Sequence, residues 1–334
     1  MRKTWMKRAA ALLLLTLLLG LCACGRNATP PADTAENVPA DTKTPETPET
    51  PETPETPEAP VEPETQPEDP DTAENADPLA DTPCLELTDQ LPYELDWDGD
   101  GEKETVDMVA VHTNNSDDPS FPLKLTNGGE TWRSMDPGVW TARLYLTRLD
   151  GSYALLLTGD SGSCDYVTYC WRLTAGDPEP VRFTGETRWT ASASSEHAEC
   201  EFKRVDEAGQ LWFEGLVYML GTYGGQRPYT LAADGSLAPV EGSIWDYVNN
   251  EQPITARIDL EAKSVSARNG EEDGGTLTVP AGEKLLLTGS DGTSRVWFEW
   301  NGQFGVFEVE KRDYQWFIGG LEENEVFGDL PYAG

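Results

Sequence analysis

Short runs of β-branched, aromatic and leucine residues, separated by turn residues, fill most of positions 83–334. Runs of this length are typical of strands, and no stretch sustains the 3.6-residue apolar period of an amphipathic helix. Strands spaced about 8–12 residues apart predict an all-β fold, either propeller-like or a sandwich, over most of this region. The expected strands are 105–111, 142–149, 153–157, 166–173, 181–184, 200–205, 211–220, 229–232, 254–260, 276–279, 284–288, 296–300, 304–309 and 314–318.

Turn residues between these runs indicate where hairpins close and where the chain divides. Asn301-Gly302 stands between two aromatic runs and predicts a type I′ turn, which needs positive φ at both residues. Polar residues near 242–253 predict a boundary between a β domain at 83–245 and a second domain at 250–334. The stretch from Val279 through Trp300 to Phe307 resembles bacterial SH3-like domains. This resemblance covers 254–320 and implies a small SH3-like β-barrel.

The first residues indicate export and anchoring. An apolar run at 9–21 has the length of a signal-peptide core and is too short to span a membrane. It is preceded by four basic residues, Arg2, Lys3, Lys7 and Arg8. Leu21-Cys22-Ala23-Cys24-Gly25 resembles a bacterial lipobox, with small Ala23 before Cys24. The resemblance implies a signal peptide at 1–23, lipidation of Cys24 and a place on the extracellular face of the bacterial cell membrane.

A tether is expected at 24–82. Thr-Pro-Glu repeats five times between Thr44 and Glu58, and almost nothing in this segment can be buried. Proline at every third position favours extended polyproline II, and glutamate repulsion keeps such a segment stretched. We therefore expect a disordered, acidic spacer between the lipid anchor and the folded part.

The charge balance restricts the class of partner. The chain has 60 acidic residues against 24 lysines and arginines, a net charge of −36. Nucleic acids require a basic footprint, so they are excluded as partners, and so is peripheral docking on anionic lipid. Contact with the membrane is expected through the lipid anchor alone. A cell-wall glycan, a surface protein or a cation fits this charge better.

The strongest chemical motif is Asp-Trp-Asp-Gly-Asp-Gly-Glu-Lys-Glu at residues 96–104. Carboxylates at alternate positions converge on one centre if the backbone curls, and Gly101 permits the sharp bend. Hard cations such as Ca²⁺ take six to eight oxygens, and a short acidic loop supplies most of them. The predicted ligands are Asp96, Asp98, Asp100 and Glu104, with Glu102 contributing its backbone carbonyl. An EF-hand is disfavoured because its twelfth position here is Asp107, in a strand pattern.

The spacing Asp-x-Asp-x-Asp-Gly-x-x-Glu at the entrance to a strand resembles the calcium loops of FG-GAP and VCBS repeats, the integrin-α-like propeller blades. The resemblance covers about 25 residues and implies a Ca²⁺ site with the ligands named above. Only degenerate copies of this motif follow it in the chain, near Asp150-Gly151 and Asp234-Gly235.

No catalytic residues are predicted. Two histidines and no paired ligands at zinc spacing argue against a zinc enzyme. The Gly159–Ser163 segment resembles the nucleophile loop of chymotrypsin-like proteases, but a turn between two strands explains it more simply. Four cysteines in the folded part permit two disulfides in three pairings, which the sequence leaves open: Cys84, Cys164, Cys170 and Cys200.

Taken together, these patterns predict that the protein is a calcium-stabilised, non-enzymatic binding, adhesion or display module of the cell envelope. The alternative is a secreted hydrolase or its carbohydrate-binding accessory protein. Tryptophan faces stack on sugar rings, so five tryptophans are candidates for carbohydrate binding: Trp132, Trp140, Trp297, Trp300 and Trp316. Most tryptophans in a small β domain, however, belong to its core.

Overall fold

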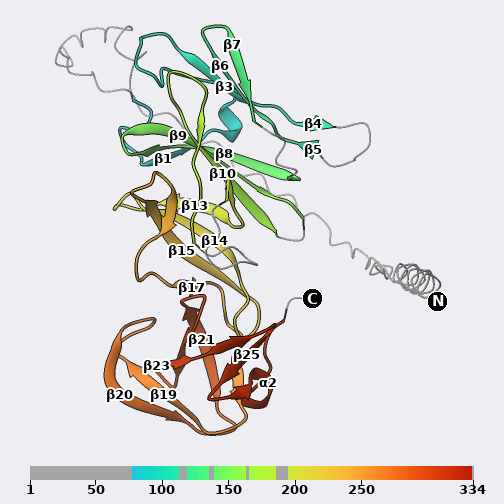
Figure 1. Ribbon diagram of the computed structural model, residues 1–334, viewed down its shortest axis with the longest axis vertical. Helices are drawn as coiled ribbons and strands as arrows, with labels where there is room; N and C mark the ends of the chain where they lie inside the picture. The colour runs from blue at the N-terminus through green and yellow to red at the C-terminus, as the bar shows by residue number, and fades with distance from the viewer. Residues whose placement is uncertain (1–76, 113–118, 135–138, 163–164, 186–194, 333–334) are drawn as a thin grey trace, which may run out of the picture. The chain divides into compact units, whose positions relative to one another are not determined.

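The computed structural model describes residues 77–112, 119–134, 139–162, 165–185 and 195–332 (Figure 1). The chain divides into two units, 1–66 and 67–334, and every described residue belongs to the second. The predicted signal peptide, Cys24, the tether up to residue 76 and Cys164 lie outside the described residues. Within the described ranges, no helix is both long and apolar enough to cross a membrane.

Strands account for 55% of the described residues and helices for 3%, which confirms the all-β prediction (Figure 1). The helical segments among them are one 3-10 turn, η2 (Thr88–Gln90), and one short helix, α2 (Glu323–Val326). The strands form several open sheets.

The central sheet has six strands in the order β1-β8-β9-β10-β11, with β12 also paired to β10. Neighbouring strands are antiparallel. The bounds are β1 (Cys84–Glu86), β8 (Thr141–Leu149), β9 (Ser152–Asp160), β10 (Tyr166–Arg172), β11 (Glu179–Pro180) and β12 (His197–Ala198).

A four-stranded antiparallel sheet packs against one face of the central sheet. Its order is β2-β3-β6-β7. The bounds are β2 (Tyr93–Leu95), β3 (Glu104–Met108), β6 (Leu123–Asn127) and β7 (Glu130–Arg133), and a separate pair consists of β4 (Val111–His112) and β5 (Pro119–Ser120). Val106 and Leu125 of this sheet share a hydrophobic core with Leu144, Leu155 and Leu157 of the central sheet. Two sheets packed face to face in this way form a β-sandwich.

The central strands are buried on both faces, which explains their nearly continuous apolar sequence. Side chains alternate across a strand, so Leu155 and Leu157 of β9 enter the core just described, whereas Ala154 and Leu156 enter a second one. That second core contains Phe213, which comes from a strand of the largest sheet. A two-sided core requires apolar residues at successive positions.

The largest sheet has twelve strands, nine of which follow the order β13-β14-β15-β17-β21-β22-β23-β19-β20. Off this path, β16 pairs with β15, β18 pairs with β21 and β27, and β24, β25 and β26 form a separate small sheet. The bounds are β13 (Glu201–Val205), β14 (Leu211–Val217), β15 (Tyr223–Leu231), β16 (Leu237–Pro239), β17 (Trp245–Tyr247), β18 (Ile254–Ala256), β19 (Leu260–Val265), β20 (Glu272–Val279), β21 (Lys284–Ser290), β22 (Arg295–Trp300), β23 (Gln303–Glu308), β24 (Glu310–Arg312), β25 (Gln315–Ile318), β26 (Leu321–Glu322) and β27 (Phe327–Gly328).

The described strands form no closed barrel. The expected C-terminal barrel is therefore corrected to open sheets packed on a common core. Closure requires the two end strands of a sheet to pair, and the path of this sheet ends at β13 and β20, which do not.

One strand joins the two predicted β domains. β17 pairs with β15 through Gly225 and Tyr247, and with β21 through Trp245 and Ser290. The core beneath these strands likewise contains Tyr223 from before the predicted boundary together with residues beyond it. The division into 83–245 and 250–334 stays a prediction.

The predicted hairpin turn is confirmed. Trp300 pairs with Gln303, and the two residues between them have φ of 50° at Asn301 and 75° at Gly302. These values are those of a type I′ turn, whose twist matches that of the flanking strands.

Candidate metal centre

The Asp-rich segment is the loop of a hairpin between two strands. β2 and β3 are antiparallel, and the last pair before the loop is Leu95 opposite Glu104. The flanks are strands, as expected, so the loop lacks the two helices of an EF-hand. This register places Glu104 at the first position of β3, where the loop returns to the sheet.

Aspartate side chains curl the loop through hydrogen bonds to its own backbone. The Asp96 carboxylate accepts from Gly99 N at 2.7 Å and from Gly101 N at 3.1 Å. Asp100 accepts from the Glu102 N–H at 2.7 Å. Gly99 and Gly101 have φ of 79° and 94°, a region that favours glycine, so the bend predicted at Gly101 is confirmed.

Three carboxylates meet at the base of the loop. Oxygens of Asp96, Asp98 and Glu104 all lie within 4.8 Å of one another. Glu104 is only 3% exposed, whereas Asp96 and Asp98 are half-buried. Two oxygens on opposite sides of a calcium ion lie about 4.6–5.2 Å apart, since each Ca–O distance is about 2.3–2.6 Å. The spacing of the three carboxylates matches one shared cation.

The electrostatics of Glu104 reflect this crowding. Burial raises its pKa above the usual range, and the charges of Asp98, Asp96 and Asp100 raise it further. A hydrogen bond of 2.9 Å from the Trp97 backbone N–H to Glu104 Oε2 opposes this effect without cancelling it. A divalent cation would reverse the balance, because it stabilises the ionised carboxylate.

The five predicted ligands are only partly brought together. Asp96, Asp98 and Glu104 form the cluster, whereas the carboxylate of Asp100 lies outside it, on the exposed part of the loop. The role of the Glu102 backbone carbonyl stays a prediction. Outside the loop, Asn127 of β6 donates to Asp98 Oδ2 at 3.4 Å. The spacing of the motif could not reveal this contact, because it depends on the pairing of β3 with β6.

Trp97 connects the loop to the central sheet. Its side chain is buried, and its indole N–H donates to the Thr174 carbonyl at 3.0 Å. The same residue donates its backbone N–H to Glu104. The position of the buried carboxylate therefore depends on packing between two sheets as well as on the loop.

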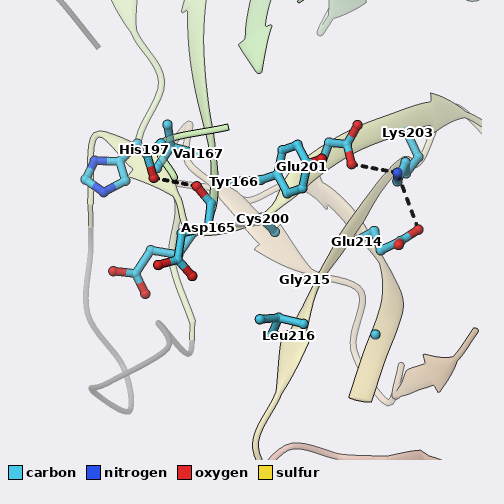
Figure 2. Close-up of a pocket in the computed structure, with 13 residues that line it drawn as sticks. Asp165, Tyr166, Val167, His197, Cys200, Glu201, Lys203, Glu214, Gly215 and Leu216 are labelled. Carbon is cyan, nitrogen blue, oxygen red and sulfur yellow. Dashed lines mark hydrogen bonds and ion pairs between the residues drawn. The ribbon is translucent and has the colours of Figure 1, made fainter. Parts of the chain in front are cut away.

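A second candidate site is a cavity of about 510 Å³ lined by residues of β10, β12, β13, β14 and β15, together with their connections. Figure 2 shows Asp165 and His197 on one side of this cavity and the ion pairs of Lys203 on the other. No sequence pattern points to this cavity, because separate strands and loops contribute its lining and no motif links them.

The serine of the protease-like segment is part of a turn, as expected. β9 and β10 pair through Asp160 and Tyr166, so the residues between them connect two strands of one hairpin. The Ser161 hydroxyl donates to the Asp165 carbonyl.

The described cysteines are free thiols. Cys84 is half-buried, whereas Cys170 and Cys200 are buried. Burial raises the pKa of the Cys170 thiol to about 12 and raises that of Cys200 as well. These thiols are thus protonated at neutral pH, and the Cys170–Cys200 alternative is not formed in this structure.

Most of the singled-out tryptophans belong to the packed interior. Trp297 and Trp316 are buried, and Trp132 packs edge-on against Trp171 with ring centroids 5.8 Å apart. Trp140 is different because it is 49% exposed.

Comparison with known proteins adds no assignment. No protein-family model, curated protein or solved structure matches the chain. The functional argument therefore depends on the geometry of the two sites.

Proposed function

We propose that the protein is a lipid-anchored, non-enzymatic binding module of the bacterial cell surface, stabilised by Ca²⁺ at the Asp-rich loop. The observation that carries this proposal is the convergence of Asp96, Asp98 and the buried Glu104 within 4.8 Å. Three carboxylates at this separation repel one another unless a cation or a proton compensates them.

The donor set favours a hard cation. All three converging side chains offer carboxylate oxygen, the ligand type that Ca²⁺ takes at about 2.3–2.6 Å. Asp100 and the Glu102 carbonyl, both predicted ligands, are on the same loop and would complete the coordination shell together with water. The site would be weak, with a dissociation constant of about 10⁻⁴–10⁻³ M, the range of extracellular modules.

Calcium at this position would act as a structural cross-link. Asp96 directly follows β2 and Glu104 begins β3, while Asp98 contacts Asn127 of β6. A cation shared by these carboxylates joins the ends of neighbouring strands and removes the repulsion at the base of the loop. The consequence is a sheet whose stability depends on extracellular calcium.

The cellular role rests on the N-terminal sequence. The lipobox-like Leu21–Gly25 segment supports lipidation of Cys24, and the acidic, proline-rich segment at 24–82 supports a spacer that holds the β domains away from the membrane. The partners that suit the acidic body are a cell-wall glycan or a surface protein.

Two experiments test the proposal. Calorimetric titration of the full-length protein with CaCl₂ should give a heat of binding that disappears in Asp96→Asn. No heat and no change of melting temperature at 10 mM CaCl₂ would exclude the calcium centre.

Metabolic labelling with an alkyne fatty acid should mark the wild type and Cys22→Ala but not Cys24→Ala, and equal labelling of both variants would refute the anchor assignment.

A further inference from the structure

We propose that the cavity beside Arg227 binds a small zwitterion, the chemistry of a free amino acid or of a short peptide with unblocked ends. This inference rests on the binding role proposed above and names the class of ligand. It does not depend on the calcium loop, because none of the three clustered carboxylates lines this cavity.

The cavity has a volume of about 810 Å³ and is lined by residues from both sides of the predicted domain boundary. Arg227 belongs to β15, before that boundary, whereas Glu271 lies in the connection between β19 and β20, beyond it. Small-molecule sites occupy about 300–1,000 Å³ and are often found where domains meet. The cavity therefore has room for a ligand that contacts both sides.

Arg227 provides a positive charge that no carboxylate of the described residues compensates. Its Nε donates to Ser243 Oγ at 3.1 Å and its Nη2 to the Ser243 carbonyl at 2.9 Å, while the guanidinium carbon lies 5.9 Å from the centre of the Trp245 ring. These uncharged partners fix the side chain, and a guanidinium carries more N–H donors than the two hydrogen bonds use. Within the described residues, Arg227 forms no ion pair. A ligand carboxylate is the group that best suits the remaining donors.

Glu271 provides a negative charge on the far side of the predicted boundary. It is exposed, and its backbone carbonyl accepts from the Ser266 N–H at 3.2 Å. In the part of the chain that the structure describes, its carboxylate has no hydrogen-bond or ion-pair partner. A ligand ammonium is the group that pairs with this carboxylate, and the contribution of such an exposed pair is small.

Two further charges of the lining, those of Arg295 and Glu272, are compensated within the protein. These residues form an ion pair with each other. Lys263 lies 3.3 Å from the same Glu272 carboxylate and 3.1 Å from that of Glu308. The two cations and two anions of this network sum to zero, so the network adds no net charge to the cavity.

Asp291 also lines the cavity, but both of its carboxylate oxygens bind its own loop. Oδ1 accepts from the backbone N–H groups of Thr293, Ser294 and Arg295 at 2.7–2.9 Å, and Oδ2 accepts from the Ser294 hydroxyl at 3.0 Å. Two arginines against three acidic residues give the lining a formal net charge of −1. A simple anion would meet this surplus and a simple cation would meet Arg227, so a ligand with one charge of each sign fits best.

Apolar side chains of the lining suit the aliphatic part of such a ligand. Ile244, Trp297 and Val306 line the cavity and pack together in one small cluster. Trp297 also donates its indole N–H to the Gly270 carbonyl at 3.0 Å, which fixes the residue next to Glu271. Contact of a methyl group with this cluster adds to the charge contacts without requiring a specific geometry.

The test is a calorimetric titration of full-length protein with Ala-Ala at pH 7, where this dipeptide is a zwitterion. Its controls are N-acetyl-Ala-Ala, which has only the negative end, Ala-Ala amide, which has only the positive end, and N-acetyl-Ala-Ala amide, which has neither. Ala-Ala should bind about threefold to tenfold more tightly than either singly blocked form. Titrations with alanine and with trialanine distinguish a free amino acid from a peptide as the source of the zwitterion.

Arg227→Gln should weaken binding of Ala-Ala and of N-acetyl-Ala-Ala about tenfold, because both ligands lose charged hydrogen bonds to their carboxylate. It should not weaken binding of Ala-Ala amide. The matched control is Arg204→Gln, which removes the same charge from an exposed position outside the cavity and should leave all affinities unchanged.

Glu271→Gln should have the opposite selectivity. It should weaken binding of Ala-Ala and of Ala-Ala amide about twofold to fivefold and spare N-acetyl-Ala-Ala. Its matched control is Glu207→Gln, which makes the same charge change on an exposed turn outside the cavity. Because Glu271 is exposed, this variant keeps the inference testable if Arg227→Gln fails to fold.

No heat with Ala-Ala, equal affinity for Ala-Ala and its doubly blocked form, or equal losses in Arg227→Gln and Arg204→Gln would overturn the inference. Repeating the titrations in EDTA separates it from the calcium proposal. Binding of Ala-Ala should persist in EDTA, so failure of one proposal leaves the other testable on its own.

Discussion

Replacing Glu104 by glutamine should change the stability of the protein in opposite directions with and without calcium. In EDTA at pH 7, the ionised Glu104 is less favourable in the folded state than in the unfolded state, because its pKa is raised. Glutamine keeps the shape and an acceptor for the Trp97 N–H but loses the charge. Glu104→Gln should therefore be at least as stable as the wild type in EDTA.

With calcium the order should reverse. A dissociation constant of about 10⁻³ M gives a stabilisation of about 1.4 kcal/mol at 10 mM CaCl₂, and 10⁻⁴ M gives about 2.7 kcal/mol. For a folded part of this size, these free energies correspond to a rise in melting temperature of about 3–10 °C. Glu104→Gln should lose most of this rise, because one of the three converging carboxylates is gone.

The pH dependence of folding stability is an independent test, because the raised pKa of Glu104 predicts its direction. A carboxyl with a raised folded pKa contributes stability below its unfolded pKa and loses that contribution as pH rises through the folded pKa. In EDTA, the wild type should therefore lose stability relative to Glu104→Gln as pH increases upward from about 4.5, the ordinary pKa of a glutamate. In CaCl₂ the wild type should instead gain relative to the variant, because ionised Glu104 binds the ion.

The assay is thermal unfolding followed by circular dichroism in EDTA and in 10 mM CaCl₂, with Glu102→Gln as the matched control. Glu102 carries the same charge on the same loop, but its carboxylate lies outside the cluster. The reasoning is refuted if Glu104→Gln is strongly destabilised in EDTA and keeps the full calcium-dependent rise. That result would make Glu104 a structural hydrogen-bond acceptor and not a ligand.

Three further substitutions test the fold by chemical denaturation. Burial raises the pKa of Asp291, but hydrogen bonds from the backbone N–H groups of residues 293–295 outweigh burial and lower the pKa. Asp291→Asn should therefore cost about 1–2 kcal/mol of stability at pH 7. The cost should become smaller as pH falls through the lowered pKa, because the carboxylate is then protonated. Gly305→Ala should cost about 1–3 kcal/mol, because the added Cβ lies 2.5 Å from Phe298 Cζ. In Gly302→Ala the added Cβ meets no neighbour, but alanine is strained at φ 75°, so this variant should lose only about 1–2 kcal/mol of stability. Losses below about 0.3 kcal/mol would contradict each argument.

Local patterns predicted the strands and turns well where the relevant interactions are short in sequence. The Asn301-Gly302 turn and the long strands β8, β9 and β10 agree with the predicted ranges within three residues at each end. By contrast, residues 221–228 lie between two predicted strands and outside both, yet Tyr223-Gly224-Gly225 begins strand β15. Gly225 is needed there because a side chain would meet Val217 and Trp245 at 3.0–3.3 Å, a contact that exists only after the sheet has formed.

The barrel prediction failed for a related reason. The sequence indicates the strands after residue 250, but apart from the Asn301-Gly302 hairpin it contains no signal for which strand lies beside which. Pairing of β17 with both β15 and β21 continues the sheet past the predicted boundary, so its edges are at β13 and β20. Register and partner choice are long-range properties, set by which apolar faces can be buried together.

The sequence alone determined the all-β class and the I′ hairpin, because these follow from side-chain alternation and positive φ within a few residues. It also predicted the acidic loop as the place for a cation, from carboxylate spacing of the same short range. The tertiary structure decided which carboxylates meet. It buried Glu104 at the start of β3, left the carboxylate of Asp100 outside the cluster, and assembled the cavity beside Lys203 from residues far apart in the chain. Burial and convergence depend on strand pairing and sheet packing, which are properties of the whole fold.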